Sequence, residues 1–285
     1  MTSHSEKSGI FVRYLILFQA LSLDVVGGAL SVGLLMTRLF RVNPQPVWWP
    51  VLALSVWAVY TSDHLIDGYA QKQQAVIMRH RMHYRYRYFF MVGVALAALL
   101  ALGLVYGFMN RKILLWGVFL GAGAFFYLMI VLFVRQRGFY FHKEFFIALF
   151  YVAGIALAPV VWYGKPVSFV QILTLTWLFL LAWAEGLLMA VYEQQEDEAD
   201  KMVSFSTFYG QRAALKFAGV LLFVAFVGAF VLLFLPVGFQ QGYLLLMAMA
   251  LMLSPLVIWP ALVKKKNRFR WLGEYAFWLP FLFFL

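Results

Sequence analysis

Residues 168–192 read SFVQILTLTWLFLLAWAEGLLMAVY and lead directly into the acidic stretch EQQEDEAD at residues 193–200. The apolar run is long enough to cross a bilayer as a helix. A second such run, residues 46–66, ends around Asp63 and is followed at once by Asp67. The chain has only 12 acidic residues, and seven of them lie in these two clusters. The pattern predicts carboxylates gathered at the ends of two membrane-spanning helices.

The composition of the whole chain is that of a membrane protein. Hydrophobic residues make up 64% of the 285 residues, charged residues make up 12%, and the mean hydropathy is +0.83. The apolar share far exceeds that of soluble domains. We therefore predict an all-α fold, a polytopic transmembrane helical bundle that forms one integral membrane domain over residues 1–285.

Two further features of the composition limit the chemistry. Cysteine is absent, which excludes disulfides, Cys-ligated zinc and iron–sulfur clusters, so that oxygen ligands must hold any metal. The net charge is +11, but no nucleic-acid-binding motif accompanies it. We expect membrane lipids as partners of the basic loops, and no nucleic acid.

Nine apolar runs are candidates for membrane-spanning helices. They are residues 10–36, 46–66, 88–106, 113–134, 145–163, 168–192, 213–235, 241–263 and 269–285. The last run is short and contains Pro280, so we expect it to be tilted, kinked or partly re-entrant.

The distribution of basic residues predicts how the spans are oriented. With nine spans, 18 of the 23 lysines and arginines fall on one side of the membrane and five fall on the other. Cytoplasmic loops are enriched in lysine and arginine. The N-terminus and both acidic clusters are therefore predicted to be cytoplasmic, at the inner or plasma membrane if the source is bacterial.

The spacing of the acidic residues points to a bound cation. Asp63 and Asp67 are four residues apart, so a helix places both carboxylates on one face. Mg²⁺ is commonly held by one or two carboxylates together with waters and substrate phosphates. A single such cluster would favour a solvated loop, whereas two facing clusters favour an Mg²⁺ site for a diphosphate. The candidate metal ligands are Asp63, Asp67, Glu193, Glu196, Asp197 and Asp200.

Three stretches resemble the UbiA superfamily of intramembrane prenyltransferases. Residues 60–67, YTSDHLID, resemble the end of its NDxxDxxxD motif, and EQQEDEADK at 193–201 resembles its DxxDxxxD motif. Residues 139–143, FYFHK, resemble the tyrosine-to-lysine stretch before the fifth helix. The family has nine helices, a cytoplasmic N-terminus and acidic motifs after the second and sixth helices, which is the layout predicted here. The chain departs from the first motif, because Val59 and Tyr60 stand where the family has an Asn-Asp pair.

The resemblance implies an Mg²⁺-dependent transferase that moves an isoprenyl group from a diphosphate donor to a lipophilic or aromatic acceptor. It also implies roles for residues in and around the clusters. The catalytic candidates are Asp63, Asp67, Glu193, Asp197 and Lys143. The substrate-binding candidates near the clusters are Tyr60, Arg79, Arg81 and Lys201. Asp24 is a further candidate, because it is an acid within the first predicted span, where a charge is costly.

Two other functions fit parts of the sequence. A transporter or permease that binds a cation at the acidic clusters would carry charged residues within its spans, as Asp24 and Glu185 are. A noncatalytic membrane scaffold derived from the prenyltransferase fold would account for the missing Asn-Asp pair. Substitution of Asp67 by asparagine separates these functions, because an enzyme should lose product formation and a scaffold should tolerate the change.

Overall fold

The computed structural model describes residues 17–71, 78–135, 142–200, 202–235, 238–264 and 268–284. These residues are almost entirely helical and include no β-strand, which confirms the predicted all-α fold. The long helices are α2 (Leu23–Phe40), α3 (Trp48–Gln71), α5 (Arg87–Phe108), α6 (Arg111–Arg135), α7 (Lys143–Tyr163), α8 (Phe169–Tyr192), α11 (Gln211–Leu233) and α12 (Gln240–Ile258). The short helices are α4 (Met78–Arg85), α9 (Gln194–Ala199), α10 (Phe205–Tyr209), α13 (Pro260–Lys264), α14 (Arg268–Ala276) and α15 (Leu279–Phe284).

The first eight predicted spans each overlap one long helix. Seven described helices, α2, α5, α6, α7, α8, α11 and α12, are long and apolar enough to cross a membrane. Helix α3 has a comparable length and carries Asp63 and Asp67 near its C-terminal end. The chain is therefore an integral multi-pass membrane protein with about the predicted number of helices.

Two predicted spans differ in detail from the structure. The first span was expected at residues 10–36, of which 10–16 lie outside the described residues, and helix α2 begins only at Leu23. Ser22 has a left-handed backbone conformation with φ of 56°, which breaks the helical path before α2. The last span is two short helices, α14 and α15, rather than one. Pro280 lies in the first turn of α15, where a missing N–H costs no helical hydrogen bond.

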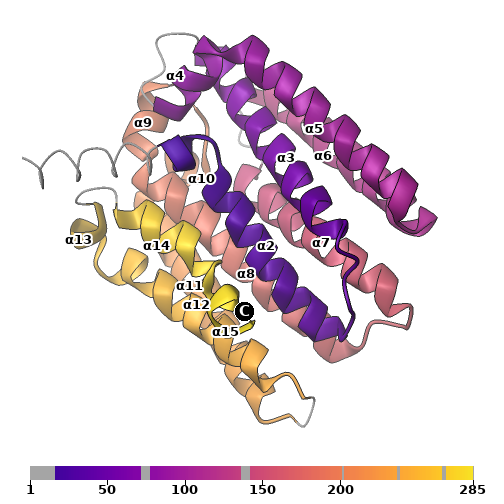
Figure 1. The fold of residues 1–285 in the computed structure, drawn as a ribbon. Coiled ribbons are helices and arrows are strands. Elements are labelled where there is room, and N and C mark those ends of the chain that lie inside the picture. Colours follow the sequence, from indigo (N-terminus) through magenta and orange to yellow (C-terminus); the bar gives the residue numbers. More distant parts are fainter. Residues whose placement is uncertain are drawn as a thin grey trace, which may run out of the picture.

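The two long helices that carry the acidic clusters, α3 and α8, both pack against α7. Helix α8 packs against α7 and α11, and α3 packs against α2, α4 and α5. The short helices α4, α9 and α10 lie at one end of the bundle, and α14 and α15 run beside α2 (Figure 1). This end therefore gathers α3, α4, α8, α9 and α14, although they come from all parts of the chain.

Burial differs between the centre and the periphery of the bundle. The face of α8 that meets its neighbours is fully buried, as Leu178, Leu181 and Leu187 show. Helices α5 and α6 keep most of their large apolar side chains exposed, for example Leu99 and Phe119. An exposed apolar surface of this extent suits contact with lipid.

Candidate active site

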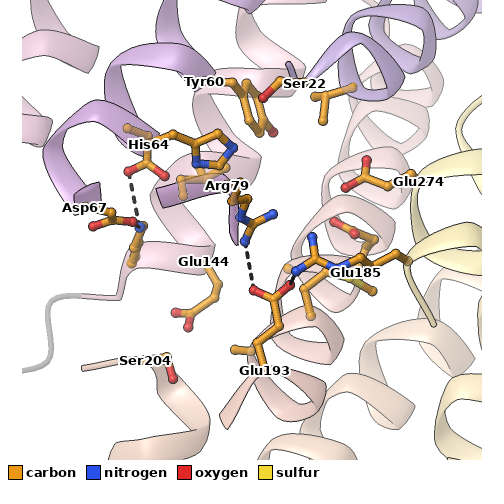
Figure 2. A pocket seen from close by; sticks show the side chains of 18 of the residues that line it. Ser22, Tyr60, His64, Asp67, Arg79, Glu144, Glu185, Glu193, Ser204 and Glu274 are labelled. Atoms are coloured by element: carbon orange, nitrogen blue, oxygen red, sulfur yellow. Dashed lines mark hydrogen bonds and ion pairs between the residues drawn. The ribbon is translucent and has the colours of Figure 1, made fainter. Parts of the chain in front are cut away.

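A cavity of about 190 Å³ lies between α2, α3, α4, α7, α8 and α14. Both acidic clusters contribute to its wall, Asp63 and Asp67 from α3 and Glu193 and Asp197 from the region where α8 ends and α9 begins. Figure 2 shows one residue of each cluster, Asp67 and Glu193, at this cavity. The two clusters are far apart in sequence and share one cavity in the fold.

Helix α3 brings its two aspartates together with a lysine. The helix continues to Gln71, so Asp63 and Asp67 lie one turn apart on the same face. The ammonium group of Lys143, the first residue of α7, lies 2.9 Å from Oδ2 of Asp67 and 3.2 Å from Oδ1 of Asp63. His142, which precedes it, has a φ of 39° and so turns the chain into α7. Lys143 thus neutralises much of the charge that the two carboxylates would otherwise concentrate.

Two arginines neutralise the second cluster. Glu193 is the residue that ends α8, and its Oε2 accepts a hydrogen bond of 2.8 Å from Arg79 on α4. Its Oε1 is ion-paired with Arg270 on α14. Burial alone would raise the pKa of Glu193, but the two guanidinium groups outweigh it and hold the pKa below its ordinary value.

Asp197 lies one helical turn after Glu193, and its backbone N–H donates to the Glu193 carbonyl at 2.8 Å. Burial and the negative charge of Glu193 raise the pKa of Asp197 to about 7. A carboxyl with this pKa is poised to ionise when a cation binds beside it.

His80 on α4 lies between the two clusters. Its Nε2 is 3.8 Å from Oδ2 of Asp67, and its Nδ1 is 3.9 Å from Oδ2 of Asp200. Burial lowers the pKa of His80 to about 3, although the charge of Asp67 opposes the shift. The imidazole is therefore neutral at physiological pH, and it lies near an acid of each cluster at distances too long for a hydrogen bond.

The predicted site residues do not all reach the cavity. Those that line it are Asp24, Tyr60, Asp63, Asp67, Arg79, Lys143, Glu193 and Asp197. Asp200 is buried beside His80, behind the cavity wall. Glu196 is half-buried and Arg81 is exposed, and neither belongs to the cavity lining. Lys201 lies outside the described residues.

Sequence reasoning missed three charged residues of the cavity, Glu144, Arg270 and Glu274. Glu144 follows Lys143, and its Oε1 accepts a hydrogen bond of 2.8 Å from the Phe205 backbone. Glu274 was identifiable, because an acid within a predicted span is costly and so a candidate for function. No local pattern would have paired Arg270 with Glu193, since the contact depends on how α14 docks.

The chemistry of the cavity fits Mg²⁺ bound together with a phosphate ligand. Among the described residues, no three His, Asp or Glu side chains converge into a ready-made metal site. Mg²⁺ does not need one, because one or two carboxylates suffice when waters and phosphates fill the other positions. Asp63 and Asp67 offer two such carboxylates one turn apart, and the Lys143 ammonium lies within 3.2 Å of both.

Comparison with known proteins identifies the fold. No protein-family model matches the chain, and no curated protein matches it in sequence. A structure of a UbiA homologue from Archaeoglobus fulgidus bound to DMAPP and Mg²⁺ superposes with a TM-score of 0.61, at 15% identity, over 94% of this chain and 98% of that one. A structure of a UbiA homologue from the same organism bound to GPP and Mg²⁺ gives a TM-score of 0.59 at the same identity and coverage. The chain therefore has a UbiA-like fold, as the resemblance of its motifs predicted.

Proposed function

We propose that this chain is an Mg²⁺-dependent intramembrane prenyltransferase, which moves an isoprenyl group from a diphosphate donor to a lipophilic or aromatic acceptor. The observation that carries the proposal is that both acidic clusters line one cavity together with Lys143 and Arg79. The fold supports it, since the similar structures from Archaeoglobus fulgidus hold DMAPP or GPP with Mg²⁺.

The side chains of the cavity suit the two parts of the donor. Asp63, Asp67 and Asp197 would hold Mg²⁺, which neutralises the charge that develops on the diphosphate when the C–O bond breaks. Lys143 and Arg79 would donate to phosphate oxygens, because an ammonium and a guanidinium both form strong charge-assisted hydrogen bonds with phosphate. The apolar tail would lie against the apolar part of the lining, which includes Ile147, Ala182 and Met189.

Glu193 has a different role in this proposal from the one its motif implies. Two guanidinium groups already pair with its carboxylate. We infer that Glu193 orients Arg79 and Arg270 toward the phosphates, and that it approaches Mg²⁺ only if the arginines move.

Binding of GPP to the purified protein, measured with and without Mg²⁺, tests the proposal. Wild type should bind GPP only with Mg²⁺, and Asp67→Asn should weaken that binding by at least about tenfold, since a ligand oxygen loses its charge. Glu198→Gln is a matched control, because Glu198 is exposed on α9 and does not line the cavity. Absence of Mg²⁺-dependent binding in folded protein would overturn the proposal.

Substitution in the first motif favours one rival function, a scaffold without turnover. Tyr60 lines the cavity where the family motif has an aspartate. A scaffold would bind GPP and Mg²⁺ yet release no diphosphate in the presence of an extract of membrane lipids and quinone precursors. Mg²⁺-dependent diphosphate release, lost in Asp67→Asn, would exclude the scaffold.

We further propose that the cavity lies near the cytoplasmic face of the membrane, as the distribution of basic residues predicts. The natural chain has no cysteine, so single cysteines can be introduced and labelled selectively. A cysteine at Glu198 should react with an impermeant maleimide only from the cytoplasmic side, and one at Lys165 only from the opposite side. Reversed labelling would show that the orientation is wrong.

A further inference from the structure

The end of the cavity away from Asp67 is lined by three carboxyl groups from three helices. They are Asp24 on α2, Glu185 on α8 and Glu274 on α14, which together we call the acidic end. Figure 2 shows Glu185 and Glu274 on the other side of Arg79 from Asp67. Unlike Asp67 and Glu193, none of the three forms an ion pair with a basic side chain within the described part of the chain.

The docking of α14 and the segment after it creates the acidic end. The indole Nε1 of Trp278 donates a hydrogen bond of 2.8 Å to the backbone carbonyl of Asp24. Glu274, four residues before Trp278, is thereby held beside α2. Gly273 allows α14 to approach α8, because a Cβ atom there would lie 3.0 Å from Oε1 of Glu185.

Ser22 and Glu185 each bring to this end a buried polar atom that has no hydrogen-bond partner among the described residues. The hydroxyl of Ser22 lines the cavity beside Tyr60, is 1% exposed and has no hydrogen-bond partner among the described residues (Figure 2). Oε1 of Glu185 is also buried and has no hydrogen-bond partner there. A buried polar atom without a hydrogen-bond partner costs free energy. The two atoms at this end of the cavity therefore favour binding of a polar ligand.

We infer that the acidic end binds the acceptor, and that the acceptor presents hydroxyl or amine groups there rather than a carboxylate. The inference rests on the proposed function, in which the diphosphate occupies the opposite end near Asp67 and Lys143. The three acidic side chains accept hydrogen bonds when ionised and attract a cation, whereas a carboxylate ligand would meet like charges. Arg270, one turn before Glu274 on α14, is ion-paired with Glu193 and in this proposal points to the diphosphate rather than to the acceptor.

The geometry also gives the acceptor's proton a destination. The C–O bond of the donor breaks, and its electron pair leaves on the diphosphate. The oxygen, nitrogen or ring carbon of the acceptor supplies the pair that forms the new bond to the isoprenyl carbon. The proton that the acceptor then loses passes to a carboxylate of the acidic end, so that atoms and charge balance.

Three small phenols of similar size test the inference: tyramine, which carries an ammonium group, 4-hydroxyphenylethanol, which is neutral, and 4-hydroxyphenylacetate, which carries a carboxylate. Their affinities are measured by calorimetry on protein loaded with Mg²⁺ and a non-hydrolysable GPP analogue. Tyramine and 4-hydroxyphenylethanol should each bind at least about tenfold more tightly than 4-hydroxyphenylacetate. This factor is the one expected when a ligand forms one charge-assisted hydrogen bond that its competitor lacks. Glu274→Gln and Asp24→Asn should each reduce this preference to less than about threefold, and Glu198→Gln should leave it unchanged.

The outcomes separate the inference from the proposed function. If the wild type does not bind the GPP analogue, the proposed function fails. If it binds the analogue but prefers 4-hydroxyphenylacetate, or binds none of the three phenols, only the assignment of the acidic end is overturned. The assignment would also be overturned if Glu274→Gln and Asp24→Asn both kept the full preference for the amine and the alcohol over the carboxylate. Binding of the GPP analogue by each variant shows that it is still folded.

Discussion

The guanidinium group of Arg79 lies 2.8 Å from Oε2 of Glu193, a residue 114 positions later in the chain. The pair joins α4, which follows the first acidic cluster, to the end of α8, where the second cluster begins. Both residues line the cavity, so this contact is part of its wall.

A double-mutant cycle on Arg79 and Glu193 should show strong coupling. Arg79→Met leaves Glu193 with one guanidinium partner, and Glu193→Gln leaves two arginines without their carboxylate. Each single change should lower thermal stability, and the two effects should be non-additive by about 1–3 kcal/mol. Unfolding of the wild type, the two single variants and the double variant in detergent, monitored by tryptophan fluorescence, gives the four stabilities that the cycle requires. Additive effects would mean that the ion pair does not stabilise the folded state.

Removal of the Lys143 ammonium should have opposite effects on the affinity for Mg²⁺ and on the affinity for GPP. Lys143→Met frees the carboxylates of Asp63 and Asp67, so Mg²⁺ alone should bind more tightly than to wild type. GPP should bind more weakly, by about tenfold or more, because one phosphate contact is lost. Calorimetric titrations with Mg²⁺ alone and with Mg²⁺ plus GPP measure both. Lys165→Met, an exposed lysine in the loop before α8, should change neither.

The neutral state of His80 predicts how stability depends on pH. Its pKa is about 3 in the folded protein, because of burial, against an ordinary value of 6.5. As the pH falls, His80 is therefore protonated in the unfolded chain before it is protonated in the folded protein. Its contribution to the free energy of unfolding is fully present above pH 6.5 and is lost as the pH drops from 6.5 toward 3. His80→Gln should make this fall shallower, by up to about 1.4 kcal/mol per pH unit.

Thermal unfolding of wild type and His80→Gln at pH 7.5, 6 and 5 checks this expectation. The exposed His142 provides the control, and His142→Gln should retain the wild-type slope. A wild-type slope in His80→Gln would show that His80 is not the group that resists protonation.

Gly27 should be irreplaceable in the contact between α2 and the C-terminal helices. A Cβ atom at this position would overlap the indole ring of Trp278. Gly27→Ala should therefore cost about 1–3 kcal/mol of stability and should disturb the acidic end, because Trp278 can no longer reach the Asp24 carbonyl. Gly103→Ala is the matched control, since no atom lies within 4 Å of a Cβ there. The control should be neutral or stabilising by up to about 1 kcal/mol.

The sequence predicted the elements of this fold better than their contacts. Apolar runs identified the long helices because a membrane span must satisfy its backbone hydrogen bonds internally, which makes length and polarity decisive. The same reasoning could not find the break between α14 and α15 in detail, although Pro280 indicated an irregularity. It also missed the break at Ser22, where a single residue leaves the helical region.

The site was predictable in part for the same reason. Helical spacing placed Asp63 and Asp67 on one face, which needs only local geometry. The partners that neutralise these clusters come from distant segments, as Lys143 does for Asp67 and Arg270 does for Glu193. Helix packing sets such contacts, and no spacing in the sequence encodes them.

The hydrogen bond from Trp278 to the Asp24 carbonyl also bears on the order of assembly. The two residues are 254 positions apart, so α2 is synthesised and inserted long before α14 exists. Until α14 docks, the part of the cavity wall that Arg270 and Glu274 contribute is missing. A chain that ends before α14 therefore cannot form the complete cavity, however well its earlier helices pack.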